Sequence, residues 1–569
     1  MKGTMSMKKR TIAGLAALGA ILGAATAAGI VTSKKRKQLE LQGNENKSLP
    51  PKRNIYFAGG GLAALSGAYY LIRDCHVPGD SIHIFEESGS VGGAFNVGGD
   101  CETGFVCAAP KLLSVRNHAN LMDMLNGLKS ANLPDMSVKD EIINFMNANP
   151  IDENARIIDD EGNIVKSGFG MSKAAVKRVK ILLSEKDYML SERTIAEFFS
   201  ETPEFIESNL WILLSSAYML RADSSAVELK HVINCVSGEM NELYTMKNSL
   251  RAQFNLQDTV IKALVAFLRA HDVNFATHCL VTDADFEPET DRISAIHLND
   301  NGTVKTFYLN EKDLFFVTNG SVSECATIGD YNYPAPVSGE LPGSAELWRR
   351  IAEKRDGFGN PEAFYDTDES DVITFTITSK SRMLLDIINE FTQNAAACGG
   401  LTTFAASPWG MTISNVPQPY FENQTDDVTV ICGTCMNVDT EGRYVEKELR
   451  YASGAEILFE LVKLIGAEDR WEEITEDIIN VIPCAMPYAS ASSLPYSDEE
   501  KPIIVKEGSN MAFIGQFAKL GAGISYSSEY AVRTAREAAY RLTGTRKSST
   551  PPPKAVMTSY IKMFKALKK

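Results

Sequence analysis

The chain has few histidines, and its net charge is negative. It has seven histidines in 569 residues and a formal net charge of −15. A general nucleic-acid-binding protein needs a basic surface for phosphate contacts, so the acidic balance disfavours that role. The scattered histidines indicate neither a metal cluster nor a Ser-His-Asp arrangement. We therefore predict no metal site and no nucleic-acid partner.

Regular cysteine spacing is absent as well. Ten cysteines are spread over the chain, which indicates free or buried thiols in a reducing compartment rather than a disulfide framework. The one C-x-x-C motif, Cys432 to Cys435, follows the apolar run 428–431 and is therefore predicted to lie in a strand. No second pair of cysteines or histidines completes a four-ligand zinc set.

One long stretch near the N-terminus lacks charge altogether. Residues 11–33 lie between the basic clusters 8–10 and 34–37, and their length just spans a bilayer. We expect an uncleaved membrane anchor with the rest of the protein on the cytoplasmic side. The alternative is an exported protein with a cleaved signal peptide, because residues 25–27 resemble a cleavage site.

The stretch 54–95 has the order strand, glycine turn, helix, strand, acid. An apolar strand at 55–58 leads through three glycines into a helix predicted to reach Leu71, and a second strand at 82–85 ends on Glu86. This order is typical of a dinucleotide-binding βαβ unit.

Individual residues of this unit have separate physical roles. Gly59 permits the tight turn, and Gly61 lets the backbone approach a pyrophosphate at the N-terminus of the helix. Ala64 takes the third glycine position, where a small residue against the strand is enough. Glu86 lies at about the spacing of the acid that hydrogen-bonds a ribose hydroxyl.

The rest of the chain mixes helical and strand-forming segments, and a chain of this length predicts two or three lobes. The helices between 172 and 250 form an insertion of the kind that commonly makes a substrate lobe. Further helices are predicted within 112–148, at 256–271 and at 528–542, with a hairpin at 155–165 and strands at 273–275, 280–282, 314–320, 373–379, 428–432 and 510–516.

The C-terminus is predicted to be a basic amphipathic helix, 554–569, after three prolines at 551–553. Its apolar residues share one face and its lysines lie largely off that face, as in a helix that binds a membrane surface. The alternative is a terminal helix that packs on the protein's own surface.

Several motifs together resemble one family, the oleate hydratases, once called myosin-cross-reactive antigens. The resemblance extends over nearly all of 54–542. It implies an FAD-binding protein that acts on long-chain unsaturated fatty acids, and members are often dimers. The motifs are 68–74 with 77–78, VTNGSVSECATIGD at 317–330, 358–361, 418–419 with Phe421, 482–488, and 513–517 with 529–533.

The expected fold is α/β, with an FAD-binding Rossmann-like doubly wound domain, a mixed substrate-domain sheet and a helical substrate lobe. The candidate FAD contacts are Gly59, Gly61, Ala64, Glu86, Gly92, Gly93, Val281, Thr318, Gly320, Gln516 and Phe517. The expected division is an anchor and tether (1–53), FAD-binding segments (54–150, 271–345 and 501–545), a helical substrate lobe (151–270), substrate-domain strands and helices (346–500) and a membrane helix (546–569).

The catalytic positions of the family are not kept. The hydratase loop R-G-G-R-E-M falls on 108–113, where Leu112 replaces the glutamate thought to activate water. The tyrosine thought to protonate the alkene falls on Val232, and an arginine falls on Pro417. Hydration of an alkene needs both a proton donor and an activated water, and leucine and valine can supply neither.

Three functions therefore stay open. The first is a fatty acid hydratase with displaced catalytic residues, for which Lys111, Glu102, Tyr218 and His231 are nearby candidates. The second is a flavin-dependent isomerase that moves or conjugates the double bond of linoleate. The third is a non-catalytic flavoprotein that binds fatty acids.

Overall fold

The fold is that of a computed structural model. It describes residues 53–107, 113–114, 117–149, 155–165, 167–246, 249–337, 341–365, 371–394, 400–489 and 500–568. The predicted N-terminal anchor, 11–33, lies outside these residues. Within them, no helix combines the length and the apolar character needed to cross a bilayer.

The first core is built on a five-stranded sheet in which every neighbouring pair is parallel. The strand order, β20-β13-β1-β2-β9, is the one typical of dinucleotide-binding domains, and it confirms the predicted Rossmann-like fold. The strands are β1 (Ile55–Ala58), β2 (Ile82–Glu86), β9 (Asn274–Thr277), β13 (Leu314–Thr318) and β20 (Met511–Ile514).

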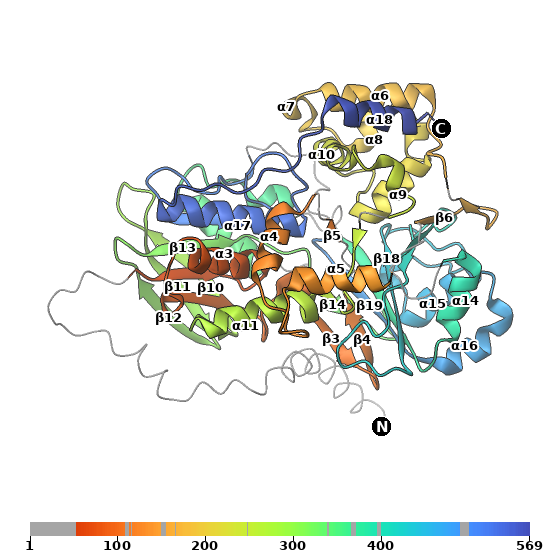
Figure 1. The fold of residues 1–569 in the computed structure, drawn as a ribbon, viewed down its shortest axis with the longest axis horizontal. Coiled ribbons are helices and arrows are strands. Elements are labelled where there is room, and N and C mark those ends of the chain that lie inside the picture. The colour runs from red at the N-terminus through yellow and green to blue at the C-terminus, as the bar shows by residue number, and fades with distance from the viewer. Residues whose placement is uncertain are drawn as a thin grey trace, which may run out of the picture.

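Different layers cover the two faces of this sheet (Figure 1). Phe57 faces α3, where its ring lies against Gly67, whereas the neighbouring Tyr56 packs at a tilt against Phe307 on the opposite face. One face therefore carries helices and the other an antiparallel three-stranded sheet. The helices are α3 (Leu62–Arg73), α4 (Ala119–Gly127), α11 (Lys262–Ala270) and α17 (Ser528–Thr543), and the strands are β10 (Cys279–Phe286), β11 (Ile293–Asp300) and β12 (Thr303–Tyr308).

The second core is an eight-stranded mixed sheet, as predicted for the substrate domain. All its neighbours are antiparallel except β16 and β6. Cys432 and Cys435 lie in β18 on opposite faces, in different core clusters, and both are buried. In order, the strands are β14 (Thr327–Ile328), β19 (Ile478–Met486), β15 (Val372–Ser379), β18 (Thr429–Cys435), β17 (Thr412–Ser414), β16 (Leu401–Phe404), β6 (Arg156–Ile158) and β7 (Ile164–Val165).

Short elements and helices cover this second sheet. Helices α14 (Met383–Thr392), α15 (Gly454–Leu464) and α16 (Trp471–Asp477) pack on one side. The hairpin of β3 (Val97–Asp100) and β4 (Gly104–Cys107) packs on the other, where the Phe105 backbone N–H donates to Thr378 Oγ1 at 3.0 Å. The chain thus leaves the nucleotide domain directly after Phe95 and reaches the second sheet.

The third core is the helical lobe, at the top of Figure 1, which contacts strands β6 and β16 of the second sheet. Serine side chains cap the N-termini of its longer helices. Ser172, Ser208 and Ser225 each accept a backbone N–H from the first turn of their helix. Its helices are α6 (Lys173–Ser184), α7 (Asp187–Leu190), α8 (Ile195–Phe198), α9 (Asn209–Tyr218) and α10 (Ala226–Val236).

The C-terminal helix, α18 (Met557–Ala566), packs on this lobe. Met563 and Leu567 are fully buried in the lobe core, and Tyr560 donates its hydroxyl to Asn234 Oδ1 at 2.7 Å. The alternative prediction, a terminal helix that packs on the protein's own surface, therefore holds for part of this helix. Part of the face fills the lobe, and Met557 and Ile561 stay exposed.

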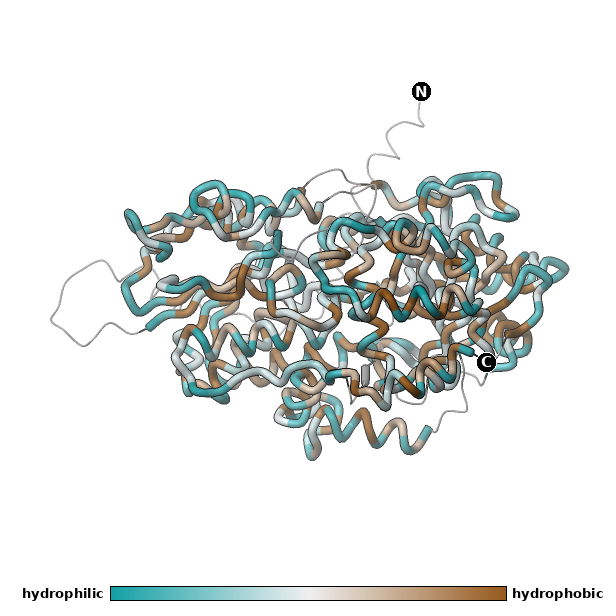
Figure 2. Tube along the Cα trace, turned by 90° about the horizontal axis from the view of Figure 1, so that it is seen from above, coloured by the Kyte–Doolittle hydropathy of each residue, from teal (hydrophilic) through white to brown (hydrophobic). Residues whose placement is uncertain are grey.

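The observed cores do not follow the expected residue ranges. The predicted hairpin 155–165 forms strands within 156–165 that belong to the eight-stranded sheet. Helix α11 packs on α3 of the nucleotide domain. The helical lobe therefore covers less of the chain than the expected range 151–270. Helix α12 (Gly343–Lys354) packs on β10 in the nucleotide domain. Figure 2 shows hydrophobic stretches toward the interior of the molecule and hydrophilic turns at its edges.

Candidate flavin and substrate sites

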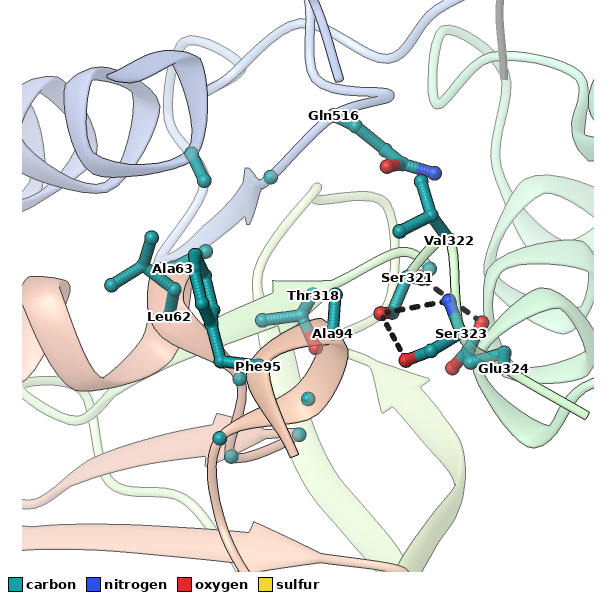
Figure 3. A pocket seen from close by; sticks show the side chains of 18 of the residues that line it. Leu62, Ala63, Ala94, Phe95, Thr318, Ser321, Val322, Ser323, Glu324 and Gln516 are labelled. Atoms are coloured by element: carbon teal, nitrogen blue, oxygen red, sulfur yellow. Dashed lines mark hydrogen bonds between the residues drawn. The ribbon is translucent and has the colours of Figure 1, made fainter. Parts of the chain in front are cut away.

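A cavity of about 330 Å³ lies at the carboxyl ends of β1, β2, β13 and β20. This is the edge at which open α/β sheets bind their ligands. Figure 3 shows the start of α3, the turn at Ala94 and Phe95, and the loop after β13 arranged around it. The lining residues are 59–63, 86–88, 92–96, Thr318, 320–325, 515–516, 526–528 and Ala531.

The glycine turn requires its glycines for different reasons. Gly59 has φ +97°, and a Cβ there would lie 2.0 Å from Thr318 Oγ1. Gly93 approaches Gly61 so closely that a Cβ on Gly93 would lie 3.1 Å from the Gly61 Cα. The floor of the cavity is therefore bare backbone, which a pyrophosphate can approach.

Helix α3 begins at this floor. Its first intrahelical hydrogen bond runs from Leu65 N–H to Gly61 O, and no described side chain caps its N-terminus. The N–H groups of residues 62–64 therefore have no acceptor within the helix, and Leu62 and Ala63 line the cavity. Such N–H groups and the positive end of the helix dipole favour an anion.

Glu86 is fixed at the wall by three hydrogen bonds. Its Oε2 accepts the Gly60 N–H at 2.7 Å, and its Oε1 accepts the N–H and the hydroxyl of Ser88 at 2.9 and 2.7 Å. This holds a carboxylate at the end of β2, where a ribose hydroxyl is expected.

Two buried polar atoms support the presence of a ligand in the cavity. Gln516 is only 9% exposed, and its Nε2 has no hydrogen-bond partner within the described part of the chain. Asn96 Oδ1 is likewise buried without a described partner. Because both residues line the cavity and buried polar groups are normally hydrogen-bonded, a ligand with donors and acceptors fits these positions.

Glu324 is a second carboxyl group of this wall. Its Oε2 accepts the Ser344 hydroxyl at 2.7 Å and the Ser321 N–H at 3.2 Å. Figure 3 shows Glu324 beside Ser321 and Ser323. Burial raises its pKa to about 7; the two hydrogen bonds oppose the shift, and the charges of Glu87 and Glu86 add to it. The site thus contains a carboxyl group that titrates near neutral pH.

A second cavity, of about 270 Å³, lies between the helical lobe and the eight-stranded sheet. It shares Tyr526, Ser527 and Ser528 with the first cavity. Its other lining residues are Asn117, His118, Ala155, Leu213, 216–219, Val236, Glu239, Glu242, Leu243, Met246, Ser249, Leu401, 412–414, 432–434 and Ile524.

The predicted catalytic residues separate into different places. Tyr218 lines the second cavity, and burial raises its pKa. His231 lines neither cavity, and its Nε2 lies 3.1 Å from Oδ2 of the half-exposed Asp187 within the lobe. Glu102 lies at another, open hollow beside Lys380, and Lys111 is outside the described residues. Among the three candidates that the structure describes, Tyr218 alone lines the candidate substrate cavity.

Most of the predicted FAD contacts come together. Gly59, Gly61, Glu86, Gly92, Gly93, Thr318, Gly320 and Gln516 all line the first cavity. Ala64 is buried within α3, as its predicted packing role requires. Val281 is buried in β10, and Phe517 packs behind Gly320, so neither of these two lines the cavity.

Several lining residues were not predicted. The turn 526–528 joins the two cavities, and its only sequence signal was the predicted start of a helix at 528. Residues 321–325 lie in the long family motif at 317–330, but the motif did not indicate which of its side chains face the cavity.

Comparison with known proteins agrees with this geometry. Residues 52–540 match the MCRA family. The chain is 31% identical over 505 residues to an oleate hydratase from Streptococcus pyogenes serotype M49 (strain NZ131), which covers 86% of this chain and 85% of that protein. It is 26% identical over 561 residues to a linoleate hydratase from Lactiplantibacillus plantarum, with 90% and 99% covered.

Among solved structures, a putrescine oxidase covers 86% of this chain and 99% of its own at 13% identity, with a TM-score of 0.47. The fold assignment rests on the strand order given above. Because the family match spans most of the chain and includes every strand of the nucleotide sheet, the chain belongs to the MCRA family, which confirms the resemblance seen in the sequence and the expectation of FAD as its cofactor.

Proposed function

We propose that this protein acts on the cis double bond of a long-chain unsaturated fatty acid, and that the reaction is the addition of water to give a 10-hydroxy fatty acid. The observation that carries the proposal is the shared wall, Tyr526 to Ser528, which places the second cavity next to the flavin cavity. The names of the two curated relatives, oleate hydratase and linoleate hydratase, support the same substrate class.

The lining of the second cavity suits a hydrocarbon chain. Apolar side chains come from the lobe and from the sheet, and burial of each CH₂ group of a fatty acid stabilises the complex by about 0.8 kcal/mol. These side chains are Leu213, Val236, Leu243, Met246, Leu401, Ile413 and Ile524.

Polar groups of the same lining are the candidates to replace the missing catalytic residues in function. Tyr218 is the candidate proton donor because it lines this cavity and its hydroxyl is protonated at neutral pH. Burial raises the pKa of this hydroxyl, so it is a weaker acid than an exposed tyrosine. Glu239 and Glu242 line the same cavity and are the candidates for activating water. The glycine turn, the start of α3 and Glu86 would hold FAD, which would supply a polarising ring system when bound.

Isomerisation of the double bond is the second candidate. The observation that favours it is Val232, which is fully buried in the lobe core at the position of the family's tyrosine. Moving a double bond needs no added water, and bound FAD could accept a hydride from one carbon and return it to another, so that no net oxidation occurs.

Product analysis separates these functions. Purified, FAD-loaded protein is incubated with linoleate and, separately, with oleate. A mass increase of one water supports hydration, a conjugated diene at unchanged mass supports isomerisation, and unchanged substrate that still binds supports a non-catalytic flavoprotein. Tyr218→Phe removes the proposed donor without changing the ring, so we expect hydration to fall by about 10² or more in kcat. Full activity of this variant would contradict the role of Tyr218.

We also propose that the protein works at a membrane surface, on its cytoplasmic face, because its substrate partitions into lipid. Candidate attachments are the uncharged segment 11–33 and the exposed residues Met557 and Ile561 of α18. A homodimer is a further expectation from the family resemblance.

A further inference from the structure

A buried ion pair links the helical lobe to the wall between the two cavities. Glu228 lies in the first turn of α10 and is 1% exposed. Lys501, which is 6% exposed, places its Nζ 3.7 Å from Glu228 Oε1. The same Oε1 accepts the hydroxyl of Ser525 at 2.9 Å.

The contact matters because Ser525 lies next to the wall that the two cavities share. Ser525 directly precedes Tyr526, Ser527 and Ser528, which line both cavities. Ser527 also caps α17 by accepting the Tyr530 N–H at 3.2 Å. A shift of Ser525 therefore moves the wall of the flavin cavity and the wall of the second cavity together.

The segment around Ser525 is held from two sides. From the nucleotide domain, Arg533 donates to the carbonyl oxygens of Ala522 and Leu520, both at 2.6 Å. From the lobe, Glu228 holds Ser525 itself. The wall thus bridges an element that packs on the flavin domain and an element that belongs to the lobe core.

Burying a charged pair between the lobe and the wall costs desolvation free energy. Removing two charges from water disfavours folding, and a well-packed apolar pair is often equally stable. What a buried charged pair with a fixed hydrogen bond adds is one defined geometry. Stability alone is therefore a poor reason for Glu228 and Lys501 at this place.

We infer that Glu228 is a positioning residue which, through Ser525 and Lys501, fixes the wall 526–528 to the helical lobe, so that filling the flavin cavity and filling the second cavity favour each other. The inference rests on the proposed function in one respect, namely that FAD and a fatty acid occupy these two cavities. Coupling of this kind is reciprocal, because each ligand must change the affinity for the other by the same factor.

Hydrogen exchange of the full-length protein tests the link without any fatty acid. In the wild type, we expect FAD to slow amide exchange at the wall and also in α10, by at least about fivefold. In Ser525→Ala, and in the double variant Glu228→Gln with Lys501→Met, we expect protection at the wall to stay and protection of α10 to disappear. The double variant removes both charges together, which keeps the fold from burying one unpaired charge.

A matched control uses another buried carboxyl group. Glu460 is fully buried, and its carboxylate accepts the backbone N–H groups of Arg443, Tyr444 and Val445 in the second core. Glu460→Gln should lower thermal stability and leave the response of α10 to FAD unchanged. Loss of the response in this control as well would show a general loosening and overturn the inference.

A second readout uses both ligands. The dissociation constant of FAD is measured by flavin fluorescence with and without oleate. Oleate should tighten FAD binding in the wild type and leave it unchanged in Ser525→Ala. Absence of FAD protection at the wall in the wild type would reject the proposed function together with the inference. Protection at the wall with α10 still responding in Ser525→Ala would overturn the inference alone.

Discussion

Two glycines of the first turn differ in what a side chain would meet. A Cβ on Gly59 would lie 2.0 Å from Thr318 Oγ1, at a positive φ. A Cβ on Gly61 would meet nothing closer than the Gly93 Cα at 3.8 Å, so the fold without cofactor tolerates it. The difference separates a residue needed for folding from one needed for the ligand.

We therefore predict that Gly61→Val folds with a melting temperature near that of the flavin-free wild type but purifies without FAD. The branched side chain would occupy the space that the pyrophosphate needs. Gly59→Ala should instead lower the melting temperature, because an alanine would be strained at the positive φ of this position. Flavin absorbance per protein and thermal denaturation measure the two effects, and normal flavin content in Gly61→Val would reject the assignment.

We predict that Glu324 makes FAD binding depend on pH. Burial raises its pKa to about 7, so the group is neutral at lower pH and charged at higher pH. The diphosphate of FAD is anionic, and a second anion in the wall opposes it. We expect the dissociation constant of FAD to rise as pH increases through about 7, and Glu324→Gln to flatten that dependence. A pH profile unchanged by this substitution would contradict the expectation.

At the scale of secondary-structure elements, an ionic network joins α3 to α17 over the nucleotide sheet. Asp74, at the end of α3, accepts hydrogen bonds from Arg73 at 2.9 Å and from the Tyr540 hydroxyl of α17. Burial would raise the pKa of Asp74, but hydrogen bonds from Arg73 and Tyr540 and the charges of Arg73 and Lys547 outweigh it and lower the pKa to about 2.

A lowered pKa makes the contribution of Asp74 sensitive to acid. The folded protein favours the charged form, so the stabilisation is present above the unfolded pKa, about 4, and is lost as pH falls toward 2. Asp74→Asn should therefore reduce the free energy of unfolding by about 2 kcal/mol at pH 7. The difference from the wild type should shrink below about pH 4. Denaturant titrations at several pH values measure this, and a difference independent of pH would exclude it.

The C-terminal helix contains two kinds of apolar residue. Met563 is fully buried against the lobe, whereas Met557 is 73% exposed. Met563→Ala should cost about 2 to 5 kcal/mol, because it leaves a cavity in the lobe core. Met557→Ser should leave the melting temperature unchanged and weaken binding to vesicles that contain anionic lipid. Equal vesicle binding by Met557→Ser and wild type would remove α18 from the proposed membrane contact.

At the scale of the whole molecule, the predictable parts were those with local signals. The unit from Ile55 to Glu86 forms as predicted because its strands, turn and helix are adjacent in the chain. The pairing of β9 with β2, and of β20 with β13, connects segments about 200 residues apart, and no local pattern specifies it. An amphipathic helix such as α18 has the same pattern whether its apolar face meets lipid or protein.

The candidate site shows the same division. The glycines and Glu86 were predicted, because a pyrophosphate and a ribose impose fixed spacings on nearby residues. The second cavity combines the lobe, β17, β18 and the turn at 526–528, and only the folded chain brings these together. Tyr218 was a candidate among four, and its position in that lining distinguishes it.

The place of β20 in the chain has a consequence for biosynthesis. Gly515 and Gln516 line the flavin cavity, and they follow the last strand of the nucleotide sheet. A ribosome that adds about 5 to 20 residues per second completes the first strand of this sheet long before the last. The nascent chain therefore carries an unpaired edge of β13 until residues 511–514 emerge, and FAD can be captured in a complete site only near the end of translation.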